Sequence, residues 1–121
     1  MPRYVILEHD HPFLHWDFML EAGDVLRTWR LLECPRPGRI IAAEALGDHR
    51  MAYLEYEGAV GGNRGTVQRW DAGTFAGSLE EERVEVDLAG GRLSGRAVLQ
   101  RDAAGRWTFA FSDVSRKGRS P

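Results

Sequence analysis

Short apolar runs, broken by glycine, proline and charged residues, limit the folds open to this 121-residue chain more than any other feature. Within several runs apolar and polar residues alternate in steps of two, which is typical of strands that bury one face. The runs are not separated by long helical segments, so the crossovers that a parallel sheet needs are missing. The pattern predicts a mainly β fold, a small antiparallel β-barrel or sandwich of about eight strands with one short helix.

The expected elements are short and follow one another closely along the chain. The strands are expected at residues 4–7, 13–21, 25–32, 39–45, 66–70, 84–88, 93–100 and 107–111. Glycine and aspartate mark the turns, which are expected at residues 23–24, 89–91 and 102–105. A helix of one or two turns is expected over residues 48–56, with Asp48 as N-cap. The three glutamates at residues 80–82 could instead begin a second short helix, and the sequence does not decide between the two structures.

The composition fits one globular domain that needs no cross-links. Hydrophobic residues at 43% and charged residues at 28% lie near the globular average. Cys34 is the single cysteine, and no apolar run approaches the length of a membrane helix. We therefore expect a cytoplasmic protein with no membrane partner. The domain is expected to cover residues 1–114, and residues 115–121 are expected to form a flexible basic tail.

Charge is distributed unevenly, although the net charge is only −2. Residues 1–26 hold one arginine against five acidic residues, whereas residues 27–50 hold five arginines against three. The net charge by itself gives no footprint for nucleic acid. The asymmetry is compatible with a cation site beside an anion site, and equally with ordinary solvated charges.

Residues 13–21 carry the most informative alternation in the chain. In a strand, side chains two residues apart share one face. The face expected to point into the core holds Leu14, Trp16, Phe18 and Leu20. The opposite face holds His15, Asp17, Met19 and Glu21. His15 and Asp17 are therefore expected side by side, facing away from the main core.

His9 completes a candidate metal site with these two residues. It ends the preceding strand, and a turn at Pro12 would return the chain so that His9 meets His15 and Asp17. Two imidazoles and a carboxylate suit Mn²⁺, Zn²⁺ or Fe²⁺ and leave positions for water or substrate. The same residues are also compatible with a solvated polar strand face. His11 is expected at the surface, pointing away from His15.

Asp48, His49 and Tyr53 form a second polar group. His49 and Tyr53 lie four residues apart and would share one face of the short helix. Such a pair can bind a phosphate or protonate a leaving group, or it can simply pack. Cys34 lacks the electropositive surroundings of a nucleophile, so covalent catalysis is not expected. The four tryptophans lie in strand patterns and are expected in the core or barrel wall.

These residues resemble a known family, the 3′-phosphoesterase domain found at the N-terminus of the bacterial end-joining ligase D and as free-standing small proteins. The resemblance runs through residues 4–10, 14–21, 25–29, 48–49, 53, 56–58, 65–67, 70–75, 91–96 and 98–99. It implies a small β-barrel with little helix, in agreement with the strand pattern. It also implies a DNA-repair hydrolase that removes a terminal ribonucleoside, and then the remaining 3′-phosphate, from nucleic-acid 3′ ends.

The resemblance implies roles for individual residues. The family's metal ligands fall on His9, His15 and Asp17, with Mn²⁺ as the usual metal. Its second catalytic histidine falls on His49, and its phosphate-side tyrosine on Tyr53. The implied partners are DNA or RNA 3′ ends and a DNA ligase or polymerase of end joining.

The chain departs from the family pattern where the family contacts phosphate. Met19 replaces an arginine, Gly47 a glutamate, and Glu33 takes the place of a lysine. Arg30 and Arg39 lie nearby in sequence and are expected to supply the lost positive charge. Two hypotheses follow, a divergent phosphoesterase and a non-catalytic DNA-end or protein-binding relative. Under the first, Met19→Arg is expected to raise activity at least about tenfold.

Overall fold

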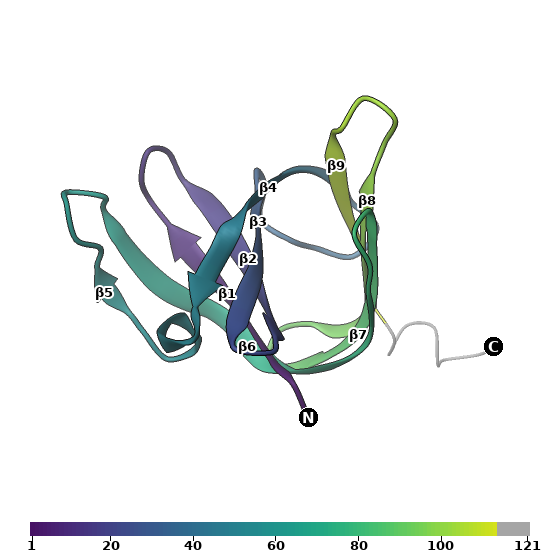
Figure 1. Ribbon diagram of the computed structural model, residues 1–121, viewed down its shortest axis with the longest axis horizontal. Coiled ribbons are helices and arrows are strands. Elements are labelled where there is room, and N and C mark those ends of the chain that lie inside the picture. Colours follow the sequence, from purple (N-terminus) through teal and green to yellow (C-terminus); the bar gives the residue numbers. More distant parts are fainter. Residues whose placement is uncertain (114–121) are drawn as a thin grey trace.

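The computed structural model describes residues 1–113 as a single antiparallel sheet closed into a ring (Figure 1). Its strands are β1 (Arg3–His9), β2 (His15–Ala22), β3 (Val25–Leu31), β4 (Ile40–Arg50), β5 (Gly58–Ala59), β6 (Thr66–Leu79), β7 (Arg83–Gly90), β8 (Ser94–Arg101) and β9 (Trp107–Asp113). The order around the ring is β1-β2-β3-β4-β9-β8-β7-β6, and β6 pairs back with β1. The expected β-barrel is confirmed, and the short β5 adds a ninth strand beside β6. The expected tail at residues 115–121 lies outside the described residues.

The prediction of a helix over residues 48–56 is wrong for residues 48–50, which belong to β4. β4 continues to Arg50, because Leu26 and Val25 of β3 pair with His49 and Arg50 and hold them extended. The helix is a single 3₁₀ turn, η1 (Met51–Leu54), without a side-chain cap at its start. Within residues 1–113, no helix is long and apolar enough to cross a membrane.

Two further boundaries differ from expectation. β6 runs on from Trp70 to Leu79, since this stretch pairs first with β1 and then with β7. Its glycines and Asp71 have low strand propensity, so the composition conceals it. The glutamates at residues 80–82 join β6 to β7 without forming a helix, and the turn expected at residues 89–91 lies after Gly90.

Apolar side chains are buried on both faces of the β1–β2–β3 region. The inner core draws on every long strand of the ring and includes Tyr4, Ile6, Phe18, Leu20 and Trp29. A second cluster on the outer face comprises Val5, Leu7, Met19, Leu26, Leu54 and Val67. The alternation expected in β2 is confirmed from Trp16 onward, but Leu14 precedes the strand and is 51% exposed. All four tryptophans lie in or against the inner core, as expected.

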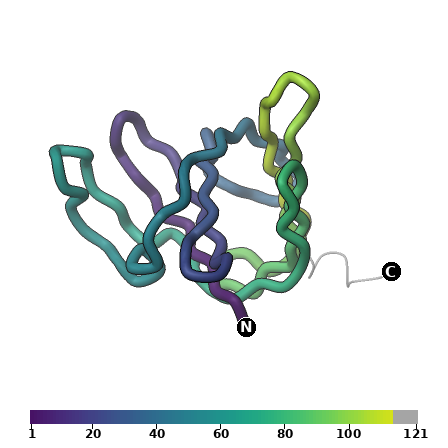
Figure 2. Tube along the Cα trace, viewed as in Figure 1, coloured from purple at the N-terminus to yellow at the C-terminus, as the bar shows by residue number. Residues whose placement is uncertain are grey.

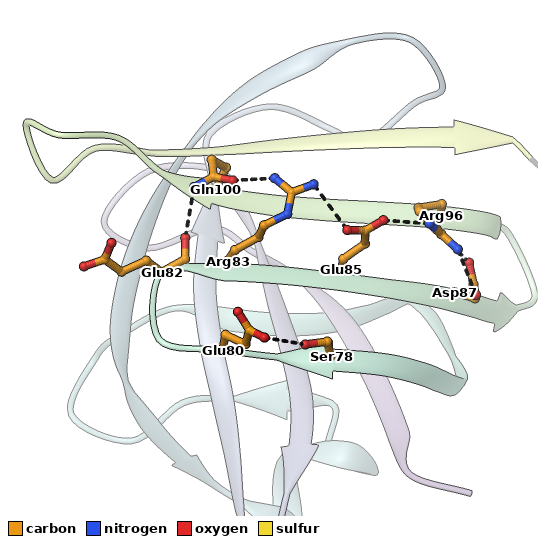
Figure 3. Close-up of polar contacts among 8 residues, drawn as sticks. All are labelled: Ser78, Glu80, Glu82, Arg83, Glu85, Asp87, Arg96 and Gln100. Atoms are coloured by element: carbon orange, nitrogen blue, oxygen red, sulfur yellow. Dashed lines mark hydrogen bonds and ion pairs between the residues drawn. The ribbon is translucent and has the colours of Figure 1, made fainter.

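The outer face of β7 and β8 is charged instead of apolar (Figure 3). Arg96 contacts Glu85 at 2.6 Å and Asp87 at 3.0 Å, and Arg83 contacts Glu85 at 3.2 Å. These side chains are at least about a third exposed, so each pair contributes only about 0–1 kcal/mol. This side of the barrel is a solvated wall.

Two loops project together from the other side of the barrel (Figure 2). They connect β1 to β2 and β5 to β6. The Asp10 carboxylate accepts hydrogen bonds from the backbone nitrogen of Thr66 at 2.8 Å and from its hydroxyl at 3.2 Å. His9 also pairs with Val67 across β1 and β6. These contacts bring the end of β1 against the β5–β6 loop.

Candidate metal centre

A cavity of about 210 Å³ opens on the outer face of β1 and β2. All four histidines of the chain line it, namely His9, His11, His15 and His49. Its other polar lining residues are Asp17, Arg30, Tyr53 and Arg64. The rest of the wall is mostly apolar and includes Leu7, Met19, Leu46, Val60 and Val67. A concave apolar site with a few converging polar groups is the usual form of a small ligand site.

His9, His15 and Asp17 form a compact cluster whose ligand atoms all lie within 4.8 Å of one another. His9 Nδ1 lies 3.1 Å from Asp17 Oδ2, and His15 Nε2 lies 3.0 Å from Oδ1. The β1–β2 register places the two histidines directly opposite each other. His15 is 1% exposed and Asp17 3% exposed, so this strand face is buried.

Backbone carbonyls fix the outer nitrogen of each imidazole. His9 Nε2 donates to the Arg64 carbonyl at 2.8 Å, and His15 Nδ1 donates to the Phe13 carbonyl at 2.8 Å. When either ring is neutral, its inner nitrogen carries a lone pair that faces the Asp17 carboxylate. His15 Nε2 and Asp17 Oδ1 are both buried without a hydrogen-bond partner among the described residues. Facing acceptors of this kind fit a divalent cation held between them, and the carbonyl contacts are the usual support of ligating histidines.

His49 and Tyr53 also line the cavity. His49 ends β4 and Tyr53 lies in η1, so the two share no helix face. Their rings nevertheless meet edge to face with centroids 5.6 Å apart. His49 Nδ1 donates to the Gly47 carbonyl at 2.8 Å, which leaves Nε2 available to a ligand.

The two arginines considered for phosphate binding lie in different places. Arg30 lies opposite Asp17 in the backbone register of β2 and β3, and it lines the cavity. Its Nη1 atom lies 3.4 Å from Glu44 Oε1. Arg39 does not line the cavity, since its guanidinium binds Glu33 through contacts of 2.8 and 3.0 Å. That pairing lowers the pKa of the Glu33 carboxyl. The position of Arg39 therefore corrects the expectation that it supplies charge to this site.

Among the polar residues of the cavity wall, sequence reasoning gave no role to Arg64 or His11, and it misjudged the apolar Met19. Arg64 lies in a glycine-rich loop that carries no signal of its own, and contacts with the end of β1, among them Asp10–Thr66, bring the loop to the site. His11 is exposed as expected, yet it lines the cavity. Met19 is 1% exposed and belongs to the outer apolar cluster.

Comparison with known proteins gives the same family along most of the chain. The family described as the DNA ligase D 3′-phosphoesterase domain matches residues 7–101. The multifunctional non-homologous end joining DNA repair protein LigD of Mycobacterium tuberculosis (strain ATCC 25618 / H37Rv) is 34% identical in an alignment 114 residues long that covers 86% of the chain. The multifunctional non-homologous end joining protein LigD of Pseudomonas aeruginosa is 32% identical in an alignment 110 residues long that covers 82% of the chain. The chain spans only 15% and 13% of the lengths of these two curated relatives.

Proposed function

The chain belongs to the DNA ligase D 3′-phosphoesterase domain family, and from this premise we propose that it is a metal-dependent phosphoesterase of DNA end joining. Its substrates are DNA or RNA 3′ ends, from which it removes a terminal ribonucleoside and then the 3′-phosphate. One observation carries the proposal, the cluster of half-buried His9 with buried His15 and Asp17, in which carbonyls hold both outer imidazole nitrogens. A DNA ligase or polymerase is the expected partner, because the relatives are named as multifunctional end-joining proteins.

His9, His15 and Asp17 would hold the divalent ion. Two nitrogens and one carboxylate accept Mn²⁺, our first choice, as well as Zn²⁺ or another transition metal. When bound, the ion polarises a phosphoryl oxygen and lowers the pKa of a water molecule. The buried walls around His15 and Asp17 exclude bulk solvent from the two ligands.

The remaining polar residues of the cavity would transfer a proton and bind the phosphate. Because Nδ1–H of His49 is held by the Gly47 carbonyl, Nε2 is the atom that would take up a proton, and from the resulting cationic ring that proton would pass to the leaving oxygen. The Tyr53 hydroxyl donates to a phosphate oxygen, and Arg30 adds positive charge beside Asp17.

Calorimetric titration of Mn²⁺ tests the metal cluster. We expect one site in the wild type that His15→Ala removes or weakens severely. His11→Ala is the matched control, because His11 lines the same cavity without belonging to the cluster. Equal Mn²⁺ affinity in the wild type and His15→Ala would exclude the cluster as the metal site.

Turnover is tested on a primer–template that ends in one ribonucleotide or in a 3′-phosphate. We expect both ends to be trimmed with Mn²⁺, and we expect His49→Ala to retain Mn²⁺ affinity while losing turnover.

A second candidate is a non-catalytic relative that binds DNA ends or a protein. The apolar Met19 and the engagement of Arg39 by Glu33 favour it, because both leave the cavity with fewer phosphate contacts. Absence of turnover with several divalent metals, combined with retained DNA binding, would establish this candidate.

A further inference from the structure

A second cavity of about 290 Å³ adjoins the metal cavity. The two cavities share Tyr53, Val60 and Arg64 in their walls. Beyond these residues the second cavity is lined by Arg50 at the end of β4 and by Tyr56 after η1. The two cavities are therefore neighbours that meet at these three residues.

The second cavity is cationic. None of the described residues that line it is acidic, while two of them are arginines. The Arg50 guanidinium has no hydrogen bond or ion pair within residues 1–113, and that of Arg64 makes one hydrogen bond, from Nε to the Gly61 carbonyl at 2.7 Å. By contrast, Arg39 and Arg96 elsewhere on the barrel are neutralised by carboxylates. Two guanidinium groups without an acid suit a phosphate.

Aromatic rings lead from one cavity to the other. His49 meets Tyr53, and Tyr53 meets Tyr56 edge to face with centroids 6.0 Å apart. Tyr56 is 39% exposed, and its hydroxyl donates to the Ala59 carbonyl, which holds the ring in place. An exposed, fixed ring beside cationic groups is the usual platform for an unpaired base.

We propose that the second cavity binds the nucleoside unit on the 5′ side of the phosphate held at the metal cluster, with its base on Tyr56 and the next backbone phosphate on Arg50 and Arg64. A 3′-terminal phosphate is attached to the rest of the strand only on its 5′ side. When this phosphate is held at the metal cluster, the nucleoside next to it must therefore occupy an adjoining site. A further cavity that shares Val60 with the metal cavity is lined by Asp10, whose carboxylate would repel that backbone. The direction of the strand rests on the proposed function, whereas binding itself is tested independently of it.

Fluorescence anisotropy of a labelled single-stranded oligothymidylate with a 3′-phosphate, measured in EDTA, tests the aromatic contact. Tyr56→Ala is expected to raise the Kd about tenfold, in line with the loss of one base–aromatic stack. Tyr56→Phe keeps the ring but loses the hydroxyl bond to Ala59, and it is expected to bind much more tightly than Tyr56→Ala. An unchanged Kd in Tyr56→Ala would overturn the role of the ring.

The salt dependence of the same Kd tests the phosphate contact. Arg50→Gln is expected to weaken binding and to reduce the slope of log K against log salt by about 0.7, the value for one lost single-strand phosphate contact. Arg106→Gln is the control, since Arg106 is 80% exposed in the turn between β8 and β9. An unchanged slope in Arg50→Gln, or an equal loss in Arg106→Gln, would overturn the subsite.

The two proposals fail in different ways. If the oligonucleotide binds and these variants weaken it, but no metal supports hydrolysis, the subsite stands and the proposed function fails. If the wild type hydrolyses the 3′-phosphate and the Tyr56→Ala and Arg50→Gln variants bind as tightly as the wild type, the function stands and the subsite is wrong.

Discussion

Met19 forms part of the wall of the metal cavity, two residues after Asp17 on β2. It is 1% exposed and belongs to an apolar cluster with Leu7, Leu26 and Val67. An arginine at this position would bring a charged side chain into this cluster, whose apolar side chains have no hydrogen-bond acceptor. Such burial costs more than a lost contact between apolar groups, because the charge is desolvated without compensation.

We therefore expect Met19→Arg to lower the free energy of unfolding by more than about 2 kcal/mol, measured by urea denaturation. Met19→Leu conserves volume and polarity and should cost less than about 1.5 kcal/mol. This replaces the expectation, drawn from the sequence, that Met19→Arg improves turnover. An arginine variant that is as stable as the wild type and hydrolyses 3′-phosphates faster would restore that expectation.

The alternation of side chains along one strand was sufficient to predict that His15 and Asp17 lie side by side on the same face of β2, because this alternation is a local property of the backbone. It could not separate Arg30 from Arg39. The cross-strand register with β2 brings Arg30 opposite Asp17, and a bidentate contact with Glu33 holds Arg39 elsewhere. Arg64 was beyond prediction, since its place depends on a contact between loops more than 50 residues apart in sequence.

At the level of elements, the metal centre depends on how the β1–β2 loop and the β5–β6 loop are held together. Asp10 binds Thr66, and the Arg64 carbonyl orients His9. Gly65 lies between these two contacts with a φ of +77°. A Cβ there would lie 2.2 Å from Asp10 Oδ1, so only glycine permits this approach.

Gly65→Ala is expected to separate the loops and withdraw the Arg64 carbonyl from His9. Mn²⁺ affinity should then fall by about 10–100-fold, as for other lost supports of a ligating histidine, although no ligand has changed. Calorimetry measures the effect. Gly38→Ala is the matched control, because Gly38 has a φ of +79° and no atom within 4 Å of its Cβ position. If both variants bind Mn²⁺ like the wild type, the loop contact does not support the metal site.

The elements most poorly predicted are those whose form is set by pairing and not by local preference. Residues 48–50 follow a helix-like pattern but extend β4, because β3 supplies ladder hydrogen bonds. The second half of β6 is rich in glycine, yet it pairs with β7 over its full length. Both cases show tertiary pairing overriding propensity.

For the whole molecule, closure of the ring is the step that the sequence does not reveal. The alternation predicts a barrel or a sandwich, while the pairing of β1 with β6 joins residues that are more than 50 positions apart. At this seam the Tyr4 hydroxyl donates to Asp71 Oδ2 at 2.6 Å. The same carboxylate accepts from the backbone nitrogens of Arg92 at 2.7 Å and Leu93 at 3.1 Å. One buried carboxylate thus ties β1, β6 and the β7–β8 turn together.

This seam predicts how stability depends on alkaline pH. Burial, the largest cause, and the hydrogen bond to Asp71 raise the pKa of Tyr4 well above its usual 10.0. Below pH 10 the hydroxyl is protonated in both states and its contribution is complete. Above pH 10 the unfolded chain loses this proton while the folded protein keeps it, so the free energy of unfolding falls by up to about 1.4 kcal/mol per pH unit.

Urea denaturation of the wild type and of Tyr4→Phe between pH 7 and 11 isolates this effect, because all other titrating groups are common to both proteins. At pH 7 we expect Tyr4→Phe to be less stable by about 1–3 kcal/mol, since Asp71 loses a buried donor. Above pH 10 the wild type should lose stability faster than the variant, so the two curves converge. Tyr56→Phe changes an exposed tyrosine outside the seam and should run parallel to the wild type throughout. If the Tyr4→Phe curve is also parallel to the wild type up to pH 11, the Tyr4 hydroxyl does not titrate abnormally, and the seam is not a source of pH-dependent stability.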